Sequence, residues 1–337
     1  MRTCFIHIGM HKTGSTAIQS AFHGYDDGKT VVLRLGKPNH TWPLLMIFSA
    51  RRDWAAKKSG ARISNLDDHI RDLRERIVSQ FQANQSNFVI TGEGLSANLT
   101  VTEIAEFKAF LSAWFDEIKI IIYFRDPISY MRSMFQETSK KSAIAFDLDL
   151  VQPSYRKRTV SWIEVFGRTK VDVVLYDRKA FTEGSVIHDF ASRIDADILC
   201  LGPQTGNATL KAEGFALTYA IRDKLAFGKP SGVQRVRLLA DLNLTPRYGK
   251  LNFDFSDAIF LNALAKQKDD IAWAEDLLQQ PFPSSKPAVD AIIFGSHNDV
   301  LRYAQESRSG FDRWKRESFS LGRRLRYLVR ALRGRVK

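Results

Sequence analysis

The stretch Thr3-Cys4-Phe5-Ile6-His7-Ile8-Gly9-Met10-His11-Lys12-Thr13-Gly14-Ser15-Thr16 decides the fold class of this chain. Its first part, up to Gly9, is a short apolar run with β-branched and aromatic residues, which is typical of a buried strand. The residues from Ser15 to Phe22 have the composition of a helix. Two glycines before a helix can present backbone N–H groups to an anion. The stretch therefore predicts a strand, a phosphate-binding loop and a helix.

The position of the loop lysine separates this stretch from the commonest phosphate loop. In the Walker A loop of ATPases and kinases, the lysine directly follows the second glycine. Here Ser15 follows Gly14, and Lys12 lies inside the loop. This displacement weighs against ATP chemistry, as does the lack of a clear Walker B strand. A P-loop-type nucleotide-dependent kinase remains the alternative enzyme, and a tight strand-to-helix turn is the alternative without a ligand.

Strands and helices alternate over the first 200 residues. Further strands are predicted at Val31–Leu33, Asn87–Thr91, Lys119–Phe124 and Val171–Tyr176. Helices are predicted at Leu66–Phe81, from the Thr100 capping box to about Phe115, from Pro127 onward, and around Val160–Phe166. This alternation indicates an α/β fold with a parallel sheet flanked by helices, and it places ligands beyond the carboxyl ends of the strands.

A second stretch, Phe124-Arg125-Asp126-Pro127-Ile128-Ser129-Tyr130-Met131-Arg132-Ser133, follows the fourth predicted strand. An arginine fork and a hydroxyl on the next helix can converge on one phosphate. Together with the Lys12 loop, this stretch resembles the sulfotransferases that use 3′-phosphoadenosine 5′-phosphosulfate. In that family a strand ending in Arg-Asp-Pro or Arg-Asn-Pro is followed by a serine eight residues after the arginine. Bacterial members often have a His-Lys-Thr-Gly loop, and Asn207-Ala208-Thr209-Leu210 also resembles one of their segments.

The resemblance implies a P-loop NTPase-like sulfotransferase fold and 3′-phosphoadenosine 5′-phosphosulfate as the donor, with no metal. It implies that Lys12 contacts the bridging and 5′-phosphate oxygens, where negative charge accumulates on the leaving group. The N–H groups and hydroxyls of the segment Thr13-Gly14-Ser15-Thr16 would hold the phosphosulfate. Arg125 and Ser133 would bind the 3′-phosphate of the donor.

The acceptor hydroxyl needs a general base, and members of the family use a glutamate or a histidine. Glu93 is the preferred candidate because it follows the third strand, on the edge where ligands bind. His11, inside the loop, is the alternative base. For Glu93, helix capping or pairing with Arg125 is the structural alternative, and His7 is expected to be a core histidine. A non-catalytic member that binds only nucleotide or glycan is a further alternative.

The acceptor is expected to be a carbohydrate or another glycan, by analogy with the family, and a small metabolite or a lipid headgroup is the next alternative. An aromatic and basic segment after the second strand could stack on sugar rings and pair with anions, although a solvated basic helix is equally compatible with it. This segment contains Trp42, Arg51, Arg52, Trp54, Lys57 and Lys58.

The rest of the chain is predicted to be mainly helical, with helices at Leu210–Leu225 and Asp257–Leu278. We expect one sulfotransferase domain over 1–310, with its α/β core at about 1–200 and a helical part at 201–310. A basic amphipathic helix would follow at 311–337. Its apolar residues Leu321, Leu325, Leu328, Val329, Leu332 and Val336 share one face, which suits either an anionic membrane surface or the core of the enzyme.

Composition limits which functional classes and partners the chain is expected to have. The net charge is +13, but residues 302–337 hold twelve Lys or Arg and three acids, so the other 301 residues carry only +4. We therefore expect no nucleic-acid partner. Two cysteines and the lack of a signal-peptide pattern favour a cytoplasmic protein. The tail leaves two alternatives open, which are peripheral contact at the inner membrane surface and packing on the core of the enzyme. The sequence does not predict the oligomeric state.

Overall fold

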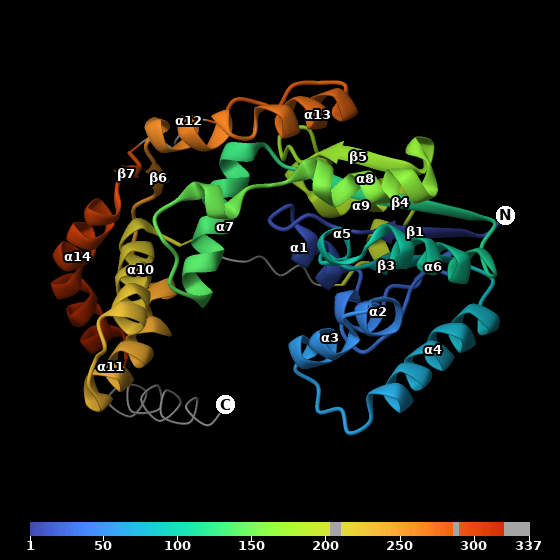
Figure 1. Cartoon of the computed structure of the whole chain (residues 1–337), viewed down its shortest axis with the longest axis horizontal. Coiled ribbons are helices and arrows are strands. Elements are labelled where there is room, and N and C mark those ends of the chain that lie inside the picture. The colour runs from blue at the N-terminus through green and yellow to red at the C-terminus, as the bar shows by residue number, and fades with distance from the viewer. Residues whose placement is uncertain (203–209, 286–289, 320–337) are drawn as a thin grey trace. The chain divides into compact units, whose positions relative to one another are not determined.

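The computed structural model describes residues 1–202, 210–285 and 290–319, which form two compact units. The first unit contains 1–126, 154–202 and 269–283 (Figure 1). The second contains 127–153, 210–268, 284–285 and 290–319. Each unit has its own core, and each is described by itself.

The first unit is built on a five-stranded sheet in which every pairing is parallel. Its strands are β1 (Thr3–His7), β2 (Thr30–Val32), β3 (Asn87–Thr91), β4 (Glu117–Phe124) and β5 (Val171–Leu175). Their order is β2-β3-β1-β4-β5. The predicted α/β class and parallel sheet are confirmed. The chain leaves β1 toward β2 on one side and β4 toward β5 on the other, so the topological switch point lies between β1 and β4.

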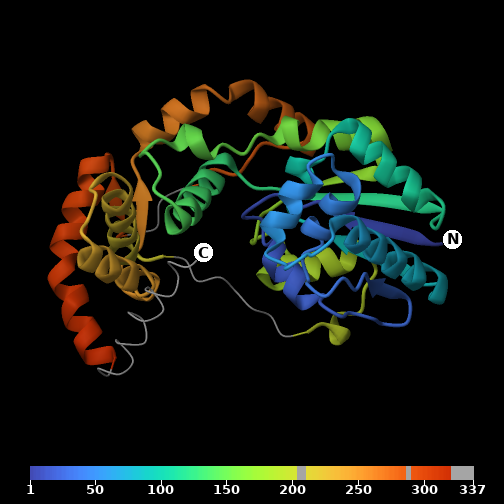
Figure 2. The ribbon, with the colours of Figure 1, turned by 60° about the horizontal axis from the view of Figure 1, so that its bottom comes forward.

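Helices cover both faces of this sheet (Figure 2). On one face α1 (Ser15–Ala21) packs with α9 (Val186–Arg193) over Phe5 and Tyr123 of the strands. The other face is rich in aromatic contacts, such as Phe81 with Phe88. Its helices are α2 (Thr41–Phe48), α4 (Leu66–Ala83), α6 (Val101–Ser112) and α8 (Tyr155–Phe166). Burial on both faces explains why the central strands are almost wholly apolar.

Shorter elements complete the first unit. They are α3 (Arg52–Ser59), α5 (Leu95–Asn98) and α13 (Lys268–Leu278), with 3₁₀ turns at Arg168–Lys170, Thr182–Gly184 and Ile198–Cys200. The predicted capping box is present at α6, where Thr100 accepts from the Glu103 amide and Glu103 accepts from the Thr100 amide. The start of α6 is therefore fixed by local chemistry.

The second unit packs helices around a two-stranded parallel sheet of β6 (Phe253–Phe255) and β7 (Ile292–Phe294). Its helices are α7 (Pro127–Lys141), α10 (Ala212–Phe227), α11 (Gly232–Leu242), α12 (Asp257–Ala265) and α14 (His297–Ser318), with 3₁₀ turns at Leu148–Val151 and Thr245–Arg247. Helix α10 packs against α7, α11 and α14. Aromatic rings fill the core, with Phe215 stacked on Phe253 at 4.2 Å.

The predicted helix Asp257–Leu278 is wrong as a single element, because the structure divides it into α12 and α13. Between them the Gln267 amide donates to the Leu264 carbonyl oxygen, three residues back, in place of the α-helical bond. The Gln267 side chain is buried and donates to the Ala263 carbonyl oxygen and the Met131 sulfur. Burial of this polar side chain accompanies the end of α12.

The predicted division at residue 310 stays a prediction. Helix α14 runs through this position to Ser318, and the apolar face from Leu321 to Val336 lies outside the described residues. The segment Asn207-Ala208-Thr209 also lies outside them. Within the described residues, no helix is both long enough and apolar enough to cross a bilayer.

Candidate functional site

The loop after β1 has a backbone that repeatedly enters the left-handed region. Gly9, Lys12 and Gly14 have φ angles of 56°, 66° and 80°. Glycine adopts this conformation without steric cost, whereas Lys12 is a non-glycine residue held there. The predicted strand, loop and helix are present, and α1 begins at Ser15 directly after Gly14. The loop therefore has a fixed shape, with Lys12 at a strained position inside it.

Two hydroxyl groups of the loop donate hydrogen bonds to a carbonyl oxygen of the same loop. Thr13 donates from Oγ1 to the Met10 carbonyl oxygen at 2.6 Å, and Ser15 donates from Oγ to the same oxygen at 3.3 Å. Both side chains are buried, while Thr16 is exposed. Thr13 and Ser15, expected from the resemblance to bind phosphosulfate through their hydroxyls, therefore bond to their own loop in this structure.

Glu93 lies directly against this loop. The Gly92 amide donates to the His7 carbonyl oxygen at 2.9 Å, which extends the β1–β3 pairing, and Ser96 donates from Oγ to the Gly9 carbonyl oxygen at 2.7 Å. A Cβ atom at Gly9 would lie 2.6 Å from the Glu93 Cα atom. The half-buried Glu93 and the Lys12 loop thus meet at the carboxyl ends of neighbouring strands. This is the edge where parallel α/β sheets bind their ligands.

Arg125 reaches the same loop from the end of β4. It donates from Nη1 to the Lys12 carbonyl oxygen at 2.8 Å, and its guanidinium carbon lies 5.6 Å from the centre of the Tyr176 ring. Gly14 is also close to this ring, since a Cβ atom there would lie 3.3 Å from Tyr176. Lys12, Arg125 and Tyr176 therefore gather beside the switch point between β1 and β4.

The backbone of Arg125 is held by Tyr155, a residue that the sequence analysis did not identify. The Tyr155 hydroxyl donates to the Arg125 carbonyl oxygen. Its ring packs with those of Phe124 and Phe282, with centroid distances of 4.9 and 5.1 Å. The amide of Tyr155 donates to the Asp270 carboxylate at 2.8 Å. No local sequence signal predicts this support, because it depends on contacts between distant segments. Tyr176 could have been predicted from the sequence, because it directly follows β5 and ligands are expected beyond the carboxyl ends of the strands.

The remaining candidate residues have separate positions. His11 is half-buried in the turn before Lys12. His7 is a core residue, as expected, with Nδ1 3.1 Å from Thr91 Oγ1, and burial lowers its pKa to about 3. Ser133 lies on α7 in the second unit, so its pairing with Arg125 stays a prediction.

The aromatic and basic segment forms a cluster of its own on α2 and α3. The Trp42 and Trp54 rings meet edge to face at 5.5 Å, and the Arg51 guanidinium lies 5.0 Å from the Trp54 ring centre. Thr41 accepts from the Gly94 amide at 3.0 Å, which places the start of α2 beside the residue that follows Glu93. Lys57 and Lys58 are exposed.

The residues described by the structure contain no group of three His, Cys, Asp or Glu side chains arranged to hold a metal ion.

No family model matches this chain. Over 105 residues it is 30% identical to an uncharacterized protein of Archaeoglobus fulgidus, a match that spans 30% of this chain and 28% of that protein. Among solved structures it is similar to a sulfotransferase from Alicyclobacillus acidocaldarius, with a TM-score of 0.46 and 12% identity, covering 84% of this chain and 98% of the other. It is also similar to the sulfotransferase domain of the Synechococcus PCC 7002 olefin synthase, with a TM-score of 0.37 and 13% identity, covering 79% and 94%.

Proposed function

We propose that this chain is a sulfotransferase that moves a sulfuryl group from 3′-phosphoadenosine 5′-phosphosulfate to a hydroxyl acceptor. One observation carries the proposal: the lysine-bearing loop after β1 meets Arg125 from β4 and Glu93 from β3 at one edge of the sheet. Two cationic side chains suit a donor with two separate anionic groups, and a carboxylate beside them suits removal of a proton from the acceptor.

Lys12 is the residue proposed to act on the leaving group. Sulfuryl transfer, like phosphoryl transfer, places negative charge on the departing phosphate, and a fixed cation opposite that charge lowers the barrier. The left-handed φ of Lys12 and the bond from Arg125 to its carbonyl oxygen fix its backbone. A fixed backbone limits the positions that the Lys12 side chain has to search before it reaches the leaving group. The backbone N–H groups of Thr13 to Thr16 would contribute to holding the phosphosulfate.

Arg125 is proposed to bind the 3′-phosphate together with Ser133. A guanidinium has five N–H donors, so its bond to the Lys12 carbonyl oxygen is compatible with a further bond to a phosphate. The Tyr176 ring beside the guanidinium and the Tyr155 hydroxyl on its backbone limit its movement. Arg125 would thereby join recognition of the 3′-phosphate to the shape of the Lys12 loop.

Glu93 is proposed as the general base, with His11 as the alternative. The loop from Gly92 to Ser96 is bonded to β1 and to Gly9, so the Glu93 backbone has a fixed place beside the donor loop. For the acceptor we propose a glycan hydroxyl, since Trp42 and Trp54 form a half-buried aromatic pair on the helices that follow β2, near the Glu93 loop. Aromatic rings of this kind can cover the apolar face of a sugar.

The test is transfer of radiolabelled sulfate from the donor to a panel of glycan, lipid and small-molecule acceptors, with a parallel assay of Mg²⁺-dependent ATP turnover. The proposal expects label in a hydroxyl compound and no ATP turnover above background. ATP turnover in the absence of sulfate transfer would favour the kinase alternative. Binding of nucleotide without either reaction would indicate a non-catalytic member of the family.

A further inference from the structure

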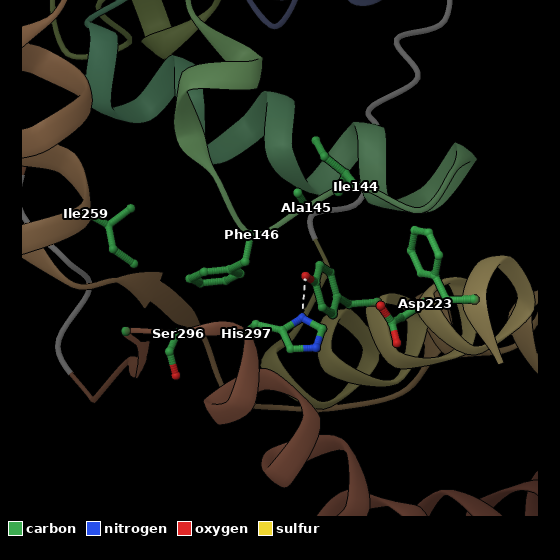
Figure 3. A pocket seen from close by; sticks show the side chains of 10 residues that line it. Ile144, Ala145, Phe146, Asp223, Ile259, Ser296 and His297 are labelled. Atoms are coloured by element: carbon green, nitrogen blue, oxygen red, sulfur yellow. Dashed lines mark hydrogen bonds between the residues drawn. The ribbon is translucent and has the colours of Figure 1, made fainter.

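The second unit contains an open pocket of about 600 Å³ that lies wholly within its own residues (Figure 3). One wall is the segment after α7 with Phe146, and another is α10 with Tyr219, Asp223 and Phe227. Ile259 of α12 and the first residue of α14, His297, also line it. The volume is in the range of pockets that hold small organic ligands.

Aromatic contacts hold the walls in place. The Phe146 ring meets Phe135 at 5.6 Å, Phe255 at 5.6 Å and Tyr219 at 6.2 Å. The Tyr219 hydroxyl lies 2.9 Å from His297 Nδ1, which joins α10 to α14. Phe227 is different, because 74% of this residue is exposed to solvent. The pocket thus has a rigid aromatic wall and one accessible ring on the last turn of α10.

The charge of the pocket is opposite to that of the protein. The chain has a net charge of +13, yet the described residues that line the pocket include no Lys or Arg and include Asp223. Asp223 makes no hydrogen bond or ion pair with any residue in the described ranges. Burial, together with the charge of Asp223, raises the pKa of Tyr219 to about 12. Among the residues that the structure describes, no cation is paired with this carboxylate, which lies on the same helix as the Tyr219 and Phe227 rings of the pocket.

The start of α14, which lines the pocket, does not suit an anion. At the start of α14, Ser296 Oγ accepts from the Asp299 amide at 3.2 Å, and the Asp299 carboxylate accepts from the Gly295 amide at 3.1 Å. These side chains already satisfy N–H groups that an anion would use, and the Asp299 carboxylate is itself paired with the Arg302 guanidinium at 3.0 Å.

We propose that this pocket binds an organic cation, with an ammonium group against Asp223 and the aromatic rings and an apolar body along Phe146 and Ile259. Aromatic faces attract cations through their quadrupole, and an adjacent carboxylate adds direct Coulomb attraction. The inference uses only residues of the second unit and does not depend on the proposed sulfuryl transfer.

The test is calorimetric titration of the full chain with trimethyl(3-phenylpropyl)ammonium, with 3-phenylpropan-1-ol as the neutral match and 3-phenylpropanoate as the anion. The ammonium is expected to bind about fivefold more tightly than the alcohol. Asp223→Asn should remove this preference and leave the affinity for the alcohol unchanged. Phe227→Leu keeps an apolar side chain but loses the ring, so it should weaken only the ammonium, by about threefold.

Glu306→Gln serves as the matched control, because Glu306 is an exposed acid of the same unit outside the pocket. It should bind all three probes as the unmodified chain does, and all variants should have unchanged circular dichroism spectra. The proposal is overturned if no probe binds, if the alcohol or the anion binds as tightly as the ammonium, or if Asp223→Asn keeps the preference.

Discussion

The Arg125 guanidinium donates to the carbonyl oxygen of Lys12 at 2.8 Å, which ties the end of β4 to the loop after β1. The two strands are neighbours in the sheet, with Ile6 paired to Ile120 and His7 to Ile121. This bond spans the switch point of the sheet, where open α/β folds bind their ligands. It means that the two proposed donor-binding cations belong to one connected structure, and a change at either residue should affect the other.

Replacing Lys12 tests the proposed role in stabilising the leaving group. Lys12→Ala should lower the turnover number for sulfate transfer by about 10²- to 10³-fold, since it removes a cation from the developing charge. The measurement is steady-state transfer of labelled sulfate. Lys12→Gly is the paired variant, because glycine relieves the left-handed backbone while also removing the charge. It should be equally inactive, and near-normal turnover in either variant would contradict the assigned role.

The close approach of Gly9 to Glu93 predicts a selective effect of a single methyl group. Gly9→Ala places a Cβ atom 2.6 Å from the Glu93 Cα atom at a φ of +56°, so the two loops must separate. We expect a loss of about 1–3 kcal/mol in the free energy of unfolding and a marked loss of transfer. Urea denaturation and transfer assays measure the two effects.

Gly24→Ala is the control for Gly9→Ala. Its φ is +79°, but no atom lies within 4 Å of the added Cβ. It should cost about 1 kcal/mol of stability through backbone strain alone and leave transfer intact. Equal effects of the two substitutions on transfer would show that contact with Glu93 is unimportant.

Glu93→Gln keeps the shape of the side chain and removes its capacity to accept a proton. The expected result is a turnover reduced by about 10²- to 10⁴-fold with donor affinity retained. Transfer kinetics and calorimetric titration of the donor product separate the two quantities. Normal turnover would exclude Glu93 as the base, and His11→Asn would then be the next variant to measure.

Buried histidines should make the fold sensitive to acid. Burial lowers the pKa of His7 to about 3 and that of His40 to about 4, both from an ordinary value of 6.5. Below a pH of about 6.5 the unfolded chain binds protons that the folded chain does not, so stability falls with falling pH. Each group should contribute about 1.4 kcal/mol per pH unit between about pH 6 and pH 4.

Urea denaturation over this pH range measures the slope for the unmodified chain and for His7→Gln, which cannot titrate but can still bond to Thr91. The slope should fall by the equivalent of about one proton in the variant. An unchanged slope would mean that His7 is protonated within the folded chain.

Local patterns were sufficient for much of the fold. Asn87–Thr91 was predicted with its observed bounds, and Pro127 begins α7 as expected, because apolar runs, proline and capping residues act over a few positions. The pairing of β6 with β7 was missed, since each has only three residues and they are far apart in the sequence. The break at Gln267 was missed because it accompanies burial against Met131.

The arrangement of the candidate site could likewise be predicted only in part from the sequence. The placement of Lys12, Glu93 and Arg125 at one edge of the sheet could be predicted because each follows a recognisable parallel strand, and the carboxyl ends of these strands share that edge. The support of Arg125 by Tyr155 could not be found, because a helix residue gives no signal of a bond to a distant carbonyl oxygen. The inward bonds of Thr13 and Ser15 also depend on the closed shape of the loop.

The proposed donor site is tested most directly by asking whether the chain binds a nucleotide that has a 3′-phosphate more tightly than one that lacks it. The measurement is calorimetric titration of the full chain and of Arg125→Met with adenosine 3′,5′-bisphosphate and with adenosine 5′-monophosphate. The unmodified chain should prefer the bisphosphate by about 10- to 100-fold, the range expected for hydrogen bonds between charged groups. Arg125→Met should bind both nucleotides with similar, weak affinity. Equal affinities in the unmodified chain, or a preference that survives in Arg125→Met, would contradict the proposed donor site.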